Sequence, residues 1–189
     1  SVNLVHSNTS AVLPGALAAR LTGRPHVWHV HEIIVHPRLL WRSLAWLLPR
    51  LSDRVVTVSE PTYRHLCLGD RLNEKKATVI HNGINLTRFD GSPGSGNALR
   101  EEWGIGVGQP LVGMIGRISR WKGQEYFLKV AALVAKSYPE TRFALVGGAV
   151  PGQEEMMDEI EAAVAQFQPS SAIILEDYRE DVPAVLDAY

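Results

Sequence analysis

The chain has 189 residues, a net charge of −1 and 46% apolar residues, a balance that predicts a packed core and excludes long disordered segments. A charge so close to zero provides no general attraction to nucleic acid, and no apolar run approaches the about twenty residues that cross a bilayer. The single cysteine, Cys67, excludes an intrachain disulfide, so we expect a reducing, cytoplasmic compartment.

Short apolar runs alternate with helical patterns through the first half of the chain, which is typical of a parallel α/β sheet. Strands are expected over 2–6, 27–30, 54–58 and 77–80, and helices over 11–21, over 38–52 and from Ser59 onward. Pro49 is expected to stop or kink the helix over 38–52 before Leu51.

The helix over 38–52 is amphipathic and basic, with leucines at helical spacing and Arg38, Arg42 and Arg50 between them. A helix of this kind can lie on a membrane surface, and it can equally pack its apolar face on a sheet. Because strands flank it on both sides, we expect a crossover helix that packs on the sheet, with at most weak contact to a membrane surface.

Histidines cluster around the second strand, where His29, His31 and His36 lie near Glu32. The spacing His31-Glu32-x-x-x-His36 is one residue longer than the helical H-E-x-x-H zinc motif, and a strand leads into it, so we expect no metal. We interpret His29 as a hydrogen-bonded core histidine. His31 follows at the carboxyl end of the strand, where binding sites form, and is a candidate site residue.

A segment rich in glycine, serine and proline, 91–97, separates the two halves. Beyond it, helices are expected over 98–103, 124–137 and 153–167, and strands over 111–115, 143–146 and 172–175. We therefore expect a first domain over 1–90, a linker over 91–108 and a second domain over 109–189.

The loop from Gly116 to Gly123 lies between a strand and a helix and carries Arg117 and Lys122 as two separated cations, with Arg120 between them. Ligands bind at the carboxyl ends of strands in open parallel sheets, and a helix start is favourable for phosphate. An arginine offers a planar fork to phosphate and a lysine a mobile point charge. We interpret the loop as a diphosphate clamp; the alternative is a solvated basic loop.

Several stretches, in their order and spacing, resemble the family 4 glycosyltransferases. They are Gly116-Arg117-Ile118 with Lys122-Gly123, Val58-Ser59, Val79-Ile80-His81-Asn82-Gly83-Ile84 with Phe89, Phe143-Ala144-Leu145-Val146-Gly147-Gly148, and Asp181-Val182-Pro183. The resemblance runs through nearly all of the chain. It implies the GT-B fold, an α/β architecture of two Rossmann-like parallel-sheet domains that face each other across a cleft.

The same resemblance implies a retaining enzyme that moves a sugar from a nucleotide-sugar donor to a sugar or lipid-linked acceptor. No metal or other cofactor is implied. Gly116, Arg117 and Lys122 would bind the donor diphosphate, and the two cations would stabilise the charge that grows on it.

The resemblance implies roles for four further residues. His31 would be catalytic and lie near the reacting sugar, and Glu32 would orient that histidine or contact the acceptor. Tyr178 and Arg179, which follow the last strand, are the candidates for contact with the nucleotide base.

Two parts of the family pattern have no match in this sequence: the glycine-rich loop after the first strand and the E-x7-E segment after the D-V-P helix. We therefore expect a central fragment with both domains incomplete, which has no transferase activity alone and self-associates through an uncovered sheet edge. Two other functions stay open, because a fold does not fix an activity. They are a GT-B sugar-nucleotide epimerase or phosphorylase-like enzyme, and a non-catalytic binding protein.

Overall fold

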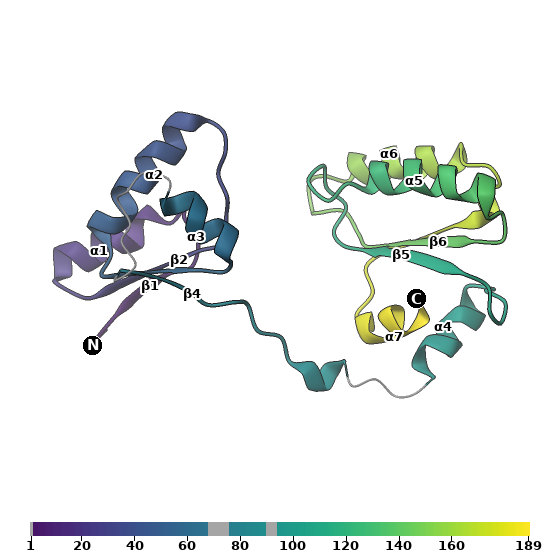
Figure 1. The fold of residues 1–189 in the computed structure, drawn as a ribbon, viewed down its shortest axis with the longest axis horizontal. Coiled ribbons are helices and arrows are strands. Elements are labelled where there is room, and N and C mark those ends of the chain that lie inside the picture. Colours follow the sequence, from purple (N-terminus) through teal and green to yellow (C-terminus); the bar gives the residue numbers. More distant parts are fainter. Residues whose placement is uncertain (1, 68–75, 90–93) are drawn as a thin grey trace. The chain divides into compact units, whose positions relative to one another are not determined.

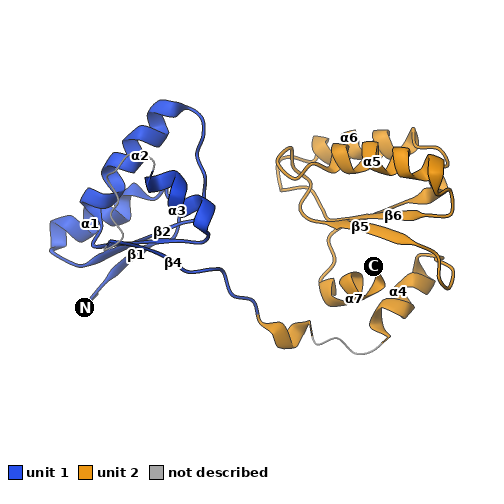
Figure 2. Ribbon diagram, in the orientation of Figure 1, with its two compact units in different colours: residues 1–84 blue, residues 85–189 orange. Residues whose placement is uncertain are grey.

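The structure, a computed structural model, describes residues 2–67, 76–89 and 94–189. The chain forms two compact units, 1–84 and 85–189, which are coloured separately in Figure 2. Each unit has its own parallel sheet, so the expected α/β architecture with two parallel-sheet domains is confirmed. We describe each unit by itself.

The first unit is a four-stranded parallel sheet in the order β1-β2-β3-β4, with one helix after each of the first three strands. The strands are β1 Val5–Ser7, β2 His26–Val30, β3 Arg54–Thr57 and β4 Ala77–Val79, and the helices are α1 Leu13–Thr22, α2 Arg38–Leu51 and α3 Glu60–Cys67. Because each crossover steps to the next strand in the same direction and with the same hand, all three helices lie on one side of the sheet (Figure 1).

Strand β2 passes through the centre of this unit and alternates between two faces. His26, Trp28 and Val30 are buried toward the helices, where Leu44 and Leu48 of α2 help to close the core. His26 is held on both ring nitrogens, by the Leu51 carbonyl at 2.7 Å and by the Ser7 hydroxyl at 2.9 Å. The Leu51 carbonyl can only accept, so Nδ1 donates to it and, in the neutral ring, Nε2 accepts from Ser7.

Helix α2 continues through Pro49 to Leu51, so the expected stop before Leu51 is wrong. Pro49 lies in the last turn and has no N–H to donate to the carbonyl four residues earlier. The buried Leu48 and the partly buried Leu51 pack in the core on either side of it and hold the turn in place.

The second unit is a three-stranded parallel sheet in the order β5-β6-β7, with helices on both faces. The strands are β5 Leu111–Ile115, β6 Arg142–Val146 and β7 Ile173–Glu176, and the helices are α4 Ser95–Glu102, α5 Gln124–Ser137, α6 Glu155–Ala165 and α7 Val182–Ala188. Short 3-10 turns cover Leu86–Arg88 and Ser170–Ala172. In Figure 1, α5 and α6 cover one face of the sheet, and α4 and α7 cover the other.

Helix α4 lies within the linker expected over 91–108 and overlaps the helix predicted over 98–103. Residues 91–93 of that segment lie outside the described residues, but α4 packs against α7, and Leu99, Trp103 and Ile105 are buried beneath the sheet. These apolar side chains need a partner surface, and α7 supplies it only after the chain has passed through the whole sheet. The pairing therefore brings the start of this unit against its end.

Candidate functional site

The loop after β5 is fastened to the exit of β6 by backbone hydrogen bonds. The Gly116 N–H donates to the Val146 carbonyl at 2.9 Å, and the Ile118 N–H donates to the Gly148 carbonyl at 3.0 Å. Ile118 is buried between this loop and the helices. The loop that carries the two cations is therefore a fixed part of the sheet edge and not a free surface loop.

Gly147 permits the closest backbone approach in this region. Its φ of +148° is rarely adopted by other residues, and a Cβ added there would lie 2.2 Å from the Gly116 carbonyl oxygen. At Gly116 itself an added Cβ would meet no atom within 4 Å. Gly147 is thus required by the fold, whereas the space beside Gly116 is open.

Helix α5 begins directly after this loop, at a left-handed Gly123 with φ 82° and without a side-chain cap. Its first residue, Gln124, is buried and donates from its side-chain amide to the Arg117 carbonyl at 2.8 Å. The first N–H groups of an uncapped helix have no intrahelical partner and attract anions. The structure therefore joins the backbone of Arg117 to an uncapped helix start.

Arg117 and Lys122 are both exposed on this loop. Neither side chain makes a hydrogen bond or ion pair with a residue that the structure describes. Two cations without a protein partner, next to an uncapped helix start, are suited to a phosphate ligand.

Arg179, after β7, is instead surrounded by carboxylates. Its guanidinium makes a two-point contact with Asp181, with both distances 2.8 Å, and also contacts Glu102 at 2.9 Å and Glu176 at 3.6 Å. The hydrogen bond from Arg179 lowers the pKa of the Asp181 carboxyl. Tyr178 is exposed. Contact of these two residues with a nucleotide base stays a prediction, but the Arg179 side chain already ties the β7 exit to α4 and α7.

At the carboxyl edge of the first sheet, the residues after β2 hold the loop after β1. The Glu32 carboxylate accepts hydrogen bonds from the Thr9 hydroxyl and from the Ser10 backbone and hydroxyl, the latter two at 3.1 and 2.8 Å. Burial alone would raise the pKa of Glu32, but these hydrogen bonds outweigh it and lower the pKa below its usual value. The carboxylate is therefore a brace between two strand exits.

His31 lies immediately after β2, as predicted, and its Nε2 is 2.9 Å from the Asn8 side-chain oxygen. Asn8 and Glu32 thus position the histidine and the neighbouring loop together. This arrangement favours the orienting role for Glu32, although contact of either residue with a substrate stays a prediction.

His29 is not the hydrogen-bonded core histidine that the sequence predicts; His26 has that role. His29 points to the sheet face away from the helices, where its ring stacks with His6 at 5.7 Å and lies 4.4 Å from His31. Its buried Nε2 has no hydrogen-bond partner among the described residues. Burial, with the positive charges of His31 and His6, lowers the pKa of His29. Within the described part of the chain, no three His, Cys, Asp or Glu side chains are grouped to hold a metal ion.

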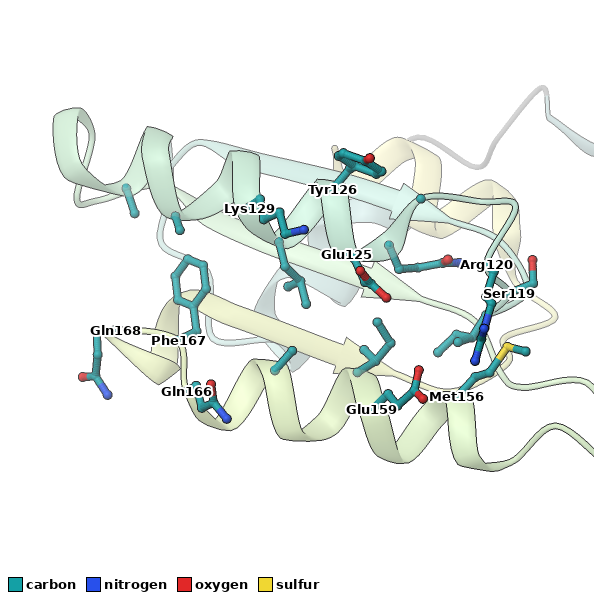
Figure 3. A pocket seen from close by; sticks show the side chains of 18 of the residues that line it. Ser119, Arg120, Glu125, Tyr126, Lys129, Met156, Glu159, Gln166, Phe167 and Gln168 are labelled. Carbon is teal, nitrogen blue, oxygen red and sulfur yellow. The ribbon is translucent and has the colours of Figure 1, made fainter.

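A groove of about 1090 Å³ separates α5 from α6 (Figure 3). Its walls are largely apolar, with Met156 at one end and Phe167 further along, and the Glu125 and Glu159 side chains lie at its edges. Neither Arg117 nor Lys122 lines it. The groove therefore lies between the two helices and reaches the loop that carries the cations, where Ser119 and Arg120 line it.

Sequence reasoning missed the residues that support the site. Gln124, Asn8, Thr9 and Ser10 act through contacts between distant segments. The only local signals were a polar residue at the first helical position after a glycine, and a polar turn after the first strand. Neither signal identifies the distant residue with which the hydrogen bond forms.

Comparison with known proteins agrees with these two units. Residues 1–88 match the family model "Glycosyltransferase Family 4", and residues 96–188 match "Glycosyl transferases group 1". The solved structure of Anabaena HepE in complex with UDP-glucose is similar over 98% of this chain, with a TM-score of 0.84 and 26% identity. A glycosyltransferase from Rickettsia africae shares the fold at 20% identity and a TM-score of 0.77.

Curated relatives are similar along most of the chain. The α-maltose-1-phosphate synthase of Mycolicibacterium smegmatis is 29% identical over 88% of the chain, and the 2-deoxystreptamine glucosyltransferase of Streptomyces kanamyceticus is 26% identical over 94%. The chain covers 46% and 48% of these proteins, and 51% of the HepE chain, so it spans about half the length of the relatives it matches.

The two parallel-sheet units, with a loop of glycines and cations at the edge of the second, have the GT-B fold. The two family models leave out only residues 89–95 and Tyr189. The chain belongs to the family 4 glycosyltransferases, with a family 4 amino-terminal unit and a group 1 carboxyl-terminal unit.

Proposed function

We propose that this chain is the central part of a glycosyltransferase that moves a sugar from a nucleoside diphosphate donor to an acceptor hydroxyl. The observation that carries the proposal is the loop held at an uncapped helix start, on which the exposed cations Arg117 and Lys122 have no partner among the described residues. The names of the relatives, which include synthases and glucosyltransferases, support glycosyl transfer as the reaction class.

The proposed chemistry places the donor diphosphate at this loop. As the bond between the sugar and the diphosphate breaks, negative charge grows on the phosphate oxygens, and Arg117 and Lys122 stabilise it together with the α5 start. The charge is neutralised by fixed protein groups, so the proposal needs no metal ion. The open space beside Gly116 lets the phosphate approach the backbone closely.

Retention at the anomeric carbon is the second part of the proposal. The acceptor hydroxyl attacks from the face that the diphosphate leaves, and an oxygen of the departing phosphate takes the hydroxyl proton. The new glycosidic bond then replaces the sugar–phosphate bond on the same face. In this proposal His31, fixed by Asn8, lines the acceptor side and requires no covalent bond to the sugar.

A uridine nucleotide is the favoured donor class, because the HepE structure, similar over nearly the whole of this chain, holds UDP-glucose. Titration calorimetry of the 189-residue chain with UDP, GDP and ADP tests the clamp and the base preference together. We expect weak binding, tightest for UDP. Because an exposed ion pair contributes about 0–1 kcal/mol, Arg117→Ala and Lys122→Ala should each weaken it by up to about fivefold.

The matched controls are Arg88→Ala and Lys136→Ala, which remove exposed cations elsewhere in the same unit. Equal loss of binding in both pairs of variants would mean that general charge, and not the loop, attracts the nucleotide. Release of free nucleotide from UDP-, GDP- and ADP-sugars is measured in parallel. Turnover by this chain that survives Arg117→Ala would contradict the proposed role of the loop.

A further inference from the structure

The groove between α5 and α6 has walls made largely of apolar side chains. Leu128 and Ala132 of α5 line it together with Ile160 of α6, and the buried Phe167 lines one end (Figure 3). Ala163, on the α6 side, is exposed, so the groove is open to solvent. Its volume of about 1090 Å³ is close to the upper end of the about 300–1,000 Å³ that is usual for small-molecule pockets. The groove is therefore large enough for a small molecule and apolar enough to take hydrocarbon out of water.

The two ends of the groove differ in electrostatic character because α5 runs along it. Ser119 and Arg120, from the loop before α5, line the end where this helix begins, and Figure 3 shows Phe167 and Gln168 at the opposite end. The start of α5 has no side-chain cap and is the positive end of the helix dipole, which adds to the charge of Arg120. Lys136 lies in the last turn of α5, where the negative end of the dipole offsets its charge. A negatively charged group is therefore favoured at the Arg120 end.

The Arg120 side chain makes no hydrogen bond or ion pair with any residue that the structure describes. Backbone hydrogen bonds hold the turn that carries it. The Lys122 N–H donates to the Ser119 carbonyl at 3.0 Å, and the N–H of the buried Ile118 donates to the Gly148 carbonyl at 3.0 Å. A free guanidinium on a fixed turn is suited to bind a carboxylate through two parallel hydrogen bonds.

Two carboxylates limit the charge that a ligand of this groove can carry. Glu125 and Glu159 also line it, and neither forms an ion pair with Arg120. They would repel a dianion such as a phosphate monoester more strongly than a monocarboxylate. The charged residues of the lining are three cations, Arg120, Lys129 and Lys136, and these two anions, so one negative charge balances them.

We propose that the groove between α5 and α6 is a binding site for an amphiphilic molecule with a single carboxylate, of the chemical class of a medium-chain fatty acid. The carboxylate binds Arg120, and the hydrocarbon chain extends between the two helices toward Phe167, in contact with Leu128 and Ile160. This site goes beyond the proposed transfer reaction, since neither cation of the diphosphate loop lines the groove. A partner helix or a second copy of the chain would use the apolar walls without needing one negative charge at the Arg120 end, so dependence on that charge separates the possible occupants.

Titration calorimetry of the full chain with octanoate, octan-1-ol and acetate tests the proposal. The first two share an eight-carbon chain and differ in charge, and acetate has the charge without the chain. We expect octanoate to bind, octan-1-ol to bind about fivefold more weakly because it lacks the ion pair, and acetate to give no measurable heat. Arg120→Gln should reduce the affinity for octanoate to that for octan-1-ol and leave octan-1-ol binding unchanged. The matched control, Lys136→Gln, removes a cation from the other end of the groove and should change neither affinity.

Ala163→Phe fills the groove from an exposed position on α6, so the fold should tolerate it. Each methylene that no longer fits costs about fourfold in affinity, so the exclusion of two should weaken octanoate binding about 15-fold. Ala162→Phe changes the neighbouring exposed residue, which does not line the groove, and should bind octanoate as the parent chain does. Circular dichroism melting curves that match the parent chain establish that the variants are folded.

Four outcomes would each overturn the proposal: no binding of octanoate, equal affinity for octanoate and octan-1-ol, equal losses in the two phenylalanine variants, or a loss in Lys136→Gln as large as that in Arg120→Gln. Sedimentation equilibrium identifies a rival occupant. Self-association of the parent chain that is abolished by Ala163→Phe but unaffected by octanoate would show that a second copy fills the groove.

Discussion

Gln124, the first residue of α5, donates a hydrogen bond from its buried side chain to the backbone carbonyl of Arg117, 2.8 Å away. This single bond connects the loop of the two cations to the helix behind it. A loop that binds a diphosphate must hold its cations in place before the ligand arrives, because ordering them on binding would weaken affinity.

Gln124→Met removes this bond at nearly constant volume and leaves the Arg117 carbonyl without that donor. We expect the free energy of unfolding to fall by about 1–2 kcal/mol, and nucleotide binding to weaken although no cation is lost. Urea unfolding and calorimetry measure the two effects. Gln153→Met, at an exposed position before α6, is the control and should change neither.

Gly116 and Gly147 face each other across the exits of β5 and β6, but they should respond differently to alanine. A methyl group fits at Gly116, so Gly116→Ala should unfold as the parent chain does and still bind UDP less well, because the methyl occupies the space that a phosphate would use. At Gly147 the methyl would meet the Gly116 carbonyl, so Gly147→Ala should lower the free energy of unfolding by about 2–4 kcal/mol. If Gly116→Ala binds UDP normally, no phosphate approaches that backbone.

Glu32 braces the loop after β1 through charged hydrogen bonds to Thr9 and Ser10. Glu32→Gln should lower the free energy of unfolding at neutral pH by about 1–2 kcal/mol, whereas Glu161→Gln on the exposed side of α6 should not. The folded-state pKa of Glu32 lies below 4.5, so its contribution is present above that pH and is lost as the pH falls through the folded-state pKa. The difference between parent and Glu32→Gln should therefore shrink in acid.

The lowered pKa of His29 predicts a second pH dependence of stability, at a higher pH than that of Glu32. Its pKa in the folded chain is lowered from 6.5 by burial and by His31 and His6, so the unfolded chain binds more protons. The stability of the first unit should fall as the pH is lowered through about 6.5, and level off below the folded-state pKa.

Urea midpoints at pH 8 and pH 5.5 measure this change. His29→Gln should reduce the loss between the two values, and the exposed His36→Gln is the control. A loss that is the same in His29→Gln and in the parent would show that other groups titrate in this range.

The helices and strands that were predicted correctly are those that a short stretch of the sequence determines by itself. The strand over 111–115 is found at the predicted residues, and the helix after Gly123 begins at Gln124, because an apolar run and a glycine are sufficient to define them. The helix predicted over 98–103 is found as α4, but its short sequence did not show that it packs against α7, far along the chain, so it was placed in a linker.

The same distinction applies to the site. Arg117, Lys122 and His31 could be named from the sequence because a cation or a histidine at the end of a strand is visible in one stretch of residues. The brace of Glu32 on Thr9 and Ser10 joins strands more than twenty residues apart, and the choice between His26 and His29 depends on which face of β2 the helices cover. Such facts arise only when distant segments meet.

The hydrophobic clusters of the described residues divide cleanly between the units: one lies within 1–84 and the other two within 85–189. Among the described residues, each of these clusters draws its buried side chains from one unit alone. The amino-terminal half can therefore change in evolution while the packing of the carboxyl-terminal half is inherited intact. Because their cores are separate, the two halves can evolve at different rates.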